Sequence, residues 1–107
     1  MPTEHIALTE AVYYILLSLY SPLHGYGIMQ KVTDLSAGRV NLAAGTLYGA
    51  LNTLLEKRWI SALPGEKNSR KKQYEITNLG AEMASKELLR LKELLTNGEK
   101  IIGGAEK

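Results

Sequence analysis

From Ala11 to Tyr20 nearly every position of the chain is apolar. Residues at three- and four-residue spacing form one stripe, which predicts an amphipathic helix: Leu8, Val12, Ile15, Leu16 and Leu19. Thr9 is the expected N-cap, and the helix should end at Ser21-Pro22, because the residue before a proline avoids helical geometry. Tyr13 and Tyr14 extend the apolar surface around the helix, so we expect these two tyrosines to face a second subunit.

Two more helices are predicted in the middle of the chain. The motif His24-Gly25-Tyr26-Gly27 leads into a helix with one shared apolar face: Ile28, Val32 and Leu35. A brief strand from Arg39 to Leu42 is expected next, and then a helix from about Ala43 to Arg58. The inward face of this third helix is apolar: Leu47, Ala50, Leu51, Leu54 and Leu55.

The outward face of the third helix is unusually bare. It carries Gly45, Gly49, Asn52 and Glu56, with Tyr48 and Thr53 beside them. A glycine inside a helix costs roughly 1 kcal/mol relative to alanine, so an exposed pair calls for a reason. One explanation is that the helix approaches a flat or grooved partner closely; neutral variation at surface positions is the alternative.

A hairpin and a long helix complete the predicted elements. Residues Ile60 to Gly65 and Lys72 to Thr77 read as two short strands, the first of which ends near Pro64. Thr77 is the expected N-cap of a final helix that runs to about Gly103. Its heptad positions are mostly apolar, and we expect them to contact a second subunit: Ala84, Leu88, Leu91, Leu95 and Ile102.

The distribution of charge adds a candidate binding loop. The net charge of the chain is only +2, yet the six residues from Lys67 to Lys72 contain four positive and no negative side chains. A local cluster on a nearly neutral chain favours an anionic partner for the hairpin tip over a uniformly basic surface. A merely solvated turn is the alternative interpretation.

Catalysis and metal binding have little support in this sequence. There is no cysteine, and the two histidines, His5 and His24, do not form a metal-binding or nucleophile-activating motif. We therefore predict no enzymatic activity, metal or cofactor, and interpret His24 as a turn residue with a backbone hydrogen bond. The apolar run from Ala11 to Tyr20 is too short to span a bilayer and no secretory signal is evident, so we predict a soluble cytoplasmic protein without a membrane partner.

The order of these elements is that of a winged helix-turn-helix. We predict a mainly α fold with a small β-hairpin: a DNA-binding domain over residues 1–77 and a C-terminal dimerisation helix over residues 78–107. Helix 43–58 would enter the major groove of double-stranded DNA, with the hairpin tip on neighbouring phosphates. The predicted DNA contacts are Gly45, Thr46, Tyr48, Gly49, Asn52, Thr53, Lys67, Ser69, Arg70, Lys71 and Lys72.

Three motifs give the chain a family resemblance. The segments Gly45-Thr46-Leu47-Tyr48-Gly49-Ala50-Leu51, His24-Gly25-Tyr26-Gly27 and Tyr74-Glu75-Ile76-Thr77-Asn78-Leu79-Gly80 resemble signatures of PadR-type transcriptional regulators. The resemblance implies a bacterial cytoplasmic repressor that dimerises through its last helix and binds a pseudo-palindromic operator. It is also compatible with a small-molecule effector.

A different class of function stays open. A winged helix can serve as a protein–protein interaction module without binding DNA. The bare helix face and the four-charge hairpin tip occur together here, and this combination favours DNA because protein interfaces are depleted in lysine.

Overall fold

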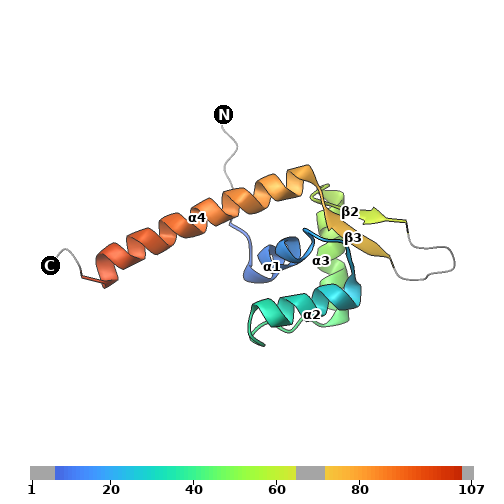
Figure 1. The fold of residues 1–107 in the computed structure, drawn as a ribbon, viewed down its shortest axis with the longest axis horizontal. Helices are drawn as coiled ribbons and strands as arrows, with labels where there is room; N and C mark the ends of the chain where they lie inside the picture. Colours follow the sequence, from blue (N-terminus) through green and yellow to red (C-terminus); the bar gives the residue numbers. More distant parts are fainter. Residues whose placement is uncertain (1–6, 65–71, 105–107) are drawn as a thin grey trace.

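The computed structural model describes residues 7–64 and 72–104. In chain order these ranges contain α1 (Glu10–Ser18), β1 (Leu23–His24), α2 (Gly25–Leu35), α3 (Ala44–Glu56), β2 (Ile60–Leu63), β3 (Gln73–Ile76) and α4 (Asn78–Ile102). The fold is mainly helical with a small antiparallel sheet (Figure 1), which confirms the predicted winged-helix class.

Three of the four helices begin with a side-chain cap. The Thr9 hydroxyl accepts a hydrogen bond from the Val12 amide, and the Thr77 hydroxyl accepts one from the Gly80 amide. At α2 the cap is His24, whose Nδ1 accepts from the Gly27 amide at 3.1 Å. This bond confirms His24 as a turn residue with a hydrogen bond to the backbone. Helix α3 has no side-chain cap, because Ala43 stands at that position.

Helix α1 ends at Ser18, three residues before the predicted stop. The Leu19 and Tyr20 amides donate to the Leu16 and Leu17 carbonyls, which tightens the last turn. The Leu19 carbonyl then accepts a hydrogen bond from the Ile76 amide at 2.9 Å. The Leu19 carbonyl therefore bonds to the sheet instead of continuing the hydrogen-bond pattern of the helix.

The predicted strand from Arg39 to Leu42 is wrong. After α2 the chain turns through Ala37 and Gly38, both at positive φ, and the Val40 amide donates to the Ser36 hydroxyl. The third strand is β1 instead, and it pairs with β3 through Leu23↔Tyr74 and His24↔Gln73. The apolar residues that suggested a strand, Val40 and Leu42, pack against the hydrophobic core without forming a ladder.

The hairpin has the predicted position and slightly shorter strands. Strands β2 and β3 pair antiparallel from Ile60↔Ile76 to Leu63↔Gln73, giving the sheet order β1-β3-β2. Strand β2 lies at the edge and ends just before Pro64, as expected for a residue without an amide donor. Residues 65–71 at the hairpin tip lie outside the described residues.

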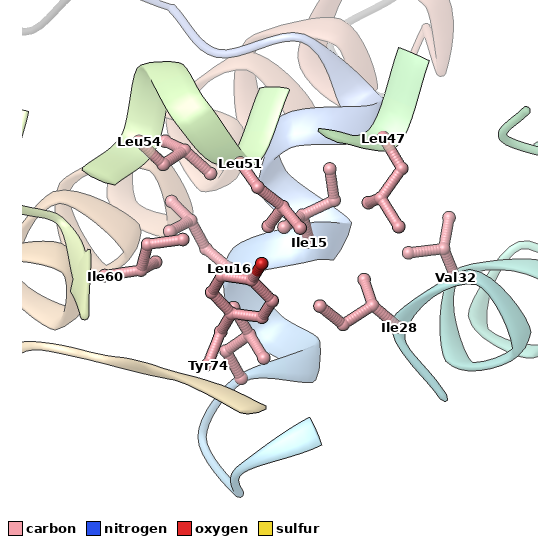
Figure 2. Packing of buried hydrophobic residues seen from close by; sticks show 10 residues of the cluster. Ile15, Leu16, Ile28, Val32, Leu47, Leu51, Leu54, Ile60 and Tyr74 are labelled. Carbon is pink, nitrogen blue, oxygen red and sulfur yellow. The ribbon is translucent and has the colours of Figure 1, made fainter. Parts of the chain in front are cut away.

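The core lies where α1, α2, α3 and the sheet meet (Figure 2). Its central members are Ile15, Leu16, Leu19, Ile28, Val32, Leu47, Leu51, Leu54, Ile60 and Tyr74. Leu35 was expected on the inward face of α2 but is 41% exposed. Leu35 is the last residue of α2, and the buried residues of this helix end at Val32.

The junction between hairpin and α4 is closely packed around Gly80. Thr77 donates hydrogen bonds from its hydroxyl to the Arg58 carbonyl and from its amide to the Trp59 carbonyl. A Cβ on Gly80 would lie 2.9 Å from the Trp59 carbonyl carbon and 2.8 Å from Ile76 Cγ1. Glycine is therefore required at position 80 by the approach of the neighbouring backbone.

We expect Gly80→Ala to destabilise the fold by about 1–3 kcal/mol, because overpacking against backbone cannot relax through a side-chain rotation. Gly49→Ala is the matched control, since a Cβ on that helical glycine meets nothing within 4 Å. Urea unfolding midpoints followed by circular dichroism measure both variants. Equal stability of the two would contradict the packing argument.

Helix α4 divides into a packed and an unpacked half. Its buried residues, Gly80, Ala84 and Glu87, all lie in the N-terminal half, which packs against α1. The C-terminal half extends away from the rest of the chain (Figure 1), and the molecule measures 64 Å along its longest axis. Half of the longest helix is thus left without an intramolecular partner among the described residues.

Candidate nucleic-acid interface

The outward face of α3 is open to solvent along its length. Gly45, Thr46, Gly49, Asn52 and Thr53 are all exposed. A Cβ built on Gly45 or Gly49 meets no atom within 4 Å. The two glycines therefore serve no packing need within the described part of the chain, and their absence of side chains lets the helix backbone approach an external surface.

The polar groups on this face differ in how freely they can bind a partner. The Thr53 hydroxyl donates to the Gly49 carbonyl at 3.2 Å, so it is already engaged within the helix. Within the described part of the chain, no hydrogen bond holds the Asn52 amide. Asn52 thus presents both an N–H donor and a C=O acceptor, which is the pair that can bind an adenine edge in two places.

Tyr48 is held at the edge of this face by a glycine on another helix. The Tyr48 side chain is 45% exposed, and a Cβ on the buried Gly25 would lie 2.8 Å from its Cζ. Its phenol also lies near Tyr74, where burial and then the proximity of Tyr48 raise the pKa of the Tyr74 phenol. The hydroxyl of Tyr48 consequently lies beside the N-terminus of α2, where an anion is favoured by the helix dipole.

The role of Gly25 was not predicted. The motif His24-Gly25-Tyr26-Gly27 predicted the start of a helix, but it did not identify Tyr48 as the side chain that packs over Gly25. The available signal was the presence of two glycines at a helix start, where serine or alanine would otherwise suffice.

Only one of the predicted basic contacts lies within the described residues. Lys72 is exposed immediately before β3. The other four predicted contacts of the hairpin tip lie outside the described residues: Lys67, Ser69, Arg70 and Lys71. Lys72, the last residue of the basic cluster, therefore lies next to the strand that also carries Tyr74.

The predicted subunit contacts fall into three groups. Leu88, Leu95 and Ile102 are 50%, 61% and 88% exposed, which makes them available to a partner. Tyr13, Tyr14 and Leu91 are half-buried, and the two tyrosine rings stack with centroids 6.4 Å apart. Burial raises the pKa of the Tyr13 phenol, and the nearby Glu87 carboxylate raises it further.

Ala84 is a correction to the predicted subunit contacts. It is only 3% exposed in the single chain, because α1 packs against this part of α4. Its heptad position places Ala84 on the apolar face of α4, but at this point the face is already covered by other residues of the same chain and is not available to a second subunit. The uncovered part begins one heptad position later, at Leu88.

The described residues contain no group of three or more acidic or histidine side chains that could hold a metal ion. Within the same ranges, no helix is long and apolar enough to cross a lipid bilayer.

Residues 14–86 match the Transcriptional regulator PadR-like family. No curated protein matches the sequence. Among solved structures, a PadR family transcriptional regulator from Eggerthella lenta superposes with a TM-score of 0.72 at 20% identity, covering 85% of this chain and 80% of that one. A transcriptional regulator from Clostridium thermocellum gives 0.66 at 22% identity, covering 91% and 92%.

A third similar structure, of a mutant MarR from E. coli, gives a TM-score of 0.67 at 18% identity, covering 87% of this chain and 64% of that one. At these identities the superpositions establish the fold. The family model matches residues 14–86, which is most of the chain, and it therefore bears on family membership as well as on the fold.

Proposed function

Because the chain belongs to the PadR-like family of transcriptional regulators, we propose that it is a bacterial cytoplasmic repressor that binds a pseudo-palindromic DNA operator as a homodimer. In this proposal α3 is the recognition helix and the β2–β3 hairpin is the wing. The family and the fold are those of transcriptional regulators rather than of enzymes.

The bare outward face of α3 is the observation that carries the proposal. A major groove about 12 Å wide admits one helix, and a helix without side chains at Gly45 and Gly49 can lie deep in it. Asn52 then lies within reach of base edges, and the hydroxyl of Tyr48 suits a phosphate oxygen. Phosphate contacts from the wing would set the register of the protein on the duplex.

The exposed face of α4 supports the homodimer. Large apolar side chains that are at least half exposed lie along the heptad face of α4 or beside it: Leu88, Leu94, Leu95 and Ile102. A shallow apolar hollow lined by Leu94, Leu95, Gly98 and Ile102 continues the face that packs against α1 nearer the start of the helix. Contiguous apolar surface of this kind marks an interaction site, and a second copy offers the same surface in return.

Asn52→Ala tests whether α3 reads bases. We expect loss of preference at one position of the selected DNA site, equivalent to roughly 1–3 kcal/mol of discrimination. Binding-site selection from a randomised duplex pool, followed by fluorescence anisotropy on cognate and altered sites, measures this effect. Glu56→Ala is the control, because this exposed residue lies at the far end of the same helix. Equal losses on cognate and random duplexes would argue against base reading by Asn52.

Removal of a wing charge is expected to act on all DNA sequences alike. Lys72→Ala or Arg70→Ala should lower the slope of log K against log salt by roughly one and leave sequence preference unchanged, because each removes one phosphate contact. Lys100→Ala near the end of α4 removes the same charge far from the wing. Anisotropy titrations at several salt concentrations measure the slope for all three variants. The control Lys100→Ala should keep the slope of the natural sequence, and an unchanged slope for Lys72→Ala or Arg70→Ala would refute a phosphate contact by that residue.

A further inference from the structure

The apolar face on the C-terminal half of α4 has two chemically different edges. The face itself is formed by Leu91, Leu95, Gly98 and Ile102. Lys92 and Glu99 lie about 70° to one side of this face, and Leu94 and Ile101 lie about 90° to the other side. We call the first pair the charged edge and the second pair, which is exposed, the apolar edge.

The charged edge has no partner on its own helix. Lys92 and Glu99 are exposed, and none of the ion pairs in the described part of the chain includes either of them. All residues three or four positions away from them are uncharged: Leu88, Leu89, Leu95, Thr96, Ile102 and Gly103. The two opposite charges are themselves about 10 Å apart along the helix axis, too far to bond each other. Both are therefore available to a second chain.

An antiparallel pair of α4 helices joins edges of the same kind. When two identical helices pack antiparallel about a two-fold axis, each edge of one helix faces the same edge of the other. Lys92 then lies opposite the partner's Glu99, and the symmetry repeats this contact with the roles exchanged. On the other side, Leu94 lies opposite the partner's Ile101. The charges thus meet opposite charges, and the apolar side chains meet each other.

A parallel pair joins edges of different kinds. In that arrangement the charged edge of one helix faces the apolar edge of its partner. Glu99 would lie against the partner's Leu94 and lose hydration without gaining an ion pair. Lys92 would face the partner's Glu87, which is 1% exposed and already bonded to Arg90 within its own chain. The distribution of charge along α4 therefore favours the antiparallel pair.

The same charges select one register of the antiparallel pair. Displacement of one helix by one heptad in either direction preserves the apolar contact but changes the charged one. One displacement brings Lys92 against the partner's Lys92, and the other brings Glu99 against the partner's Glu99. Like charges directly opposite each other are unfavourable, so only the intermediate register has matched charges on this edge.

In this register a large side chain lies opposite the glycine of the face. Leu95 is placed over the partner's Gly98, and a Cβ built on Gly98 meets nothing within 4 Å in the single chain. The hollow at Gly98, which Leu94 and Ile102 also line, offers the space for that leucine. A parallel pair would instead place two glycines opposite each other, with no side chain to fill the space between them.

We propose that the second copy bound by α4 lies antiparallel to it, in the register that places Lys92 opposite the partner's Glu99 and Leu95 over the partner's Gly98. The inference rests on the proposed homodimer and specifies how its two α4 helices are oriented. Each winged-helix body packs against the N-terminal half of its own α4 (Figure 1), so the two bodies lie at opposite ends of the paired helices.

Charge reversal on the charged edge tests this register. We expect Lys92→Glu and Glu99→Lys each to raise the dimer dissociation constant about 10-fold or more, because each creates two like-charge contacts in the symmetric pair. The double variant Lys92→Glu/Glu99→Lys restores opposite charges, so its dissociation constant should return to within about three-fold of the natural value. Sedimentation equilibrium at low ionic strength, where exposed charges are little screened, measures all three.

Two control variants make the same charge changes elsewhere on α4. Lys100→Glu and Glu93→Lys alter exposed residues about 160° and 180° around the helix from the apolar face. They should leave the dissociation constant unchanged, which separates a local contact from an effect of net charge. All four altered residues are exposed, so each variant should keep the helix content of the natural sequence, as circular dichroism measures.

The possible failures are distinguishable. If the losses of the two single variants add in the double variant, Lys92 and Glu99 do not meet across the dimer and the proposed register is wrong. Unchanged dissociation constants in both single variants would overturn it as well. In either case the natural sequence still forms a dimer, and the proposed homodimer stands. A natural sequence that sediments as a monomer would remove the homodimer itself, and this inference with it.

Discussion

Leu95→Glu is expected to convert the dimer to monomers and to abolish high-affinity DNA binding. Leu95 is 61% exposed in the single chain, so a glutamate there stays in water and leaves the protomer fold intact. In the proposed dimer the same position lies in an apolar contact, where an unpaired carboxylate is costly to bury. The substitution therefore acts on association and spares the core.

The magnitude follows from the symmetry of the contact. Burial of one leucine side chain contributes about 1.5–3 kcal/mol, and a two-fold dimer loses two of them, about 3–6 kcal/mol in all. Dimer dissociation constants should rise by about 10²–10⁴-fold. Sedimentation equilibrium at micromolar concentration measures this change, and anisotropy with a two-half-site duplex measures its effect on DNA binding.

Leu89→Glu provides the matched control for this prediction. Leu89 is 65% exposed on the same helix, but it lies about 120° around the helix axis from Leu95. The same chemical change should therefore leave the mass in solution unaltered. If both variants stay dimeric, or if the natural sequence is already monomeric at this concentration, α4 does not form the subunit contact along this face.

Long, strongly periodic segments could be predicted from the sequence to within a few residues. Helix α4 runs from Asn78 to Ile102, with Thr77 as N-cap and Gly103 at the end, as the heptad spacing and the threonine indicated. Here local signals and the tertiary structure agree, because both ends are marked by residues whose preferences arise from neighbouring backbone groups.

Strand β1 could not be predicted from the same kind of pattern. It contains only Leu23 and His24, too few residues for an alternation to be visible. Its existence depends on β3, which supplies the ladder partners from about fifty residues further along the chain. Val40 and Leu42, by contrast, have the alternation of a strand without a neighbouring strand edge to pair with.

The sequence predicted on which face of a helix each candidate residue lies, but not how far that residue is buried. Periodicity placed Ala84 and Leu35 on apolar faces, whereas their burial depends on where other helices begin and end. The same limit applies to Tyr48, whose position depends on the space above Gly25 on α2. The bare face of α3 was predictable because Gly45 and Gly49 are four residues apart and therefore fall on the same side of a helix, opposite its apolar face.

Gly49→Leu is expected to stabilise the free protein while it prevents specific DNA binding. A Cβ at position 49 meets nothing within 4 Å, so a larger side chain can be attached there and extend into open space. Replacement of glycine by a good helix former should contribute about 0.5–1 kcal/mol and raise the Tm by a few degrees. Gly49→Ala should give a similar gain in stability with less bulk.

The effect on DNA should have the opposite sign. If α3 lies with its backbone against the floor of the major groove, a leucine at position 49 holds the helix away from the base edges. Affinity for the selected site should then fall toward the non-specific level, a loss of about 10³-fold or more, and Gly49→Ala should lose less. Calorimetry and anisotropy on the same samples measure the two quantities.

Thr96→Leu is the control for added apolar bulk, because Thr96 is exposed on α4 away from the Leu95 face. It should change neither stability nor DNA affinity appreciably. The decisive feature of Gly49→Leu is that a defective fold cannot explain its loss of binding, since the variant is expected to be more stable. Retention of cognate affinity by Gly49→Leu would mean that this face of α3 does not enter the groove, and the assignment of the recognition surface would be wrong.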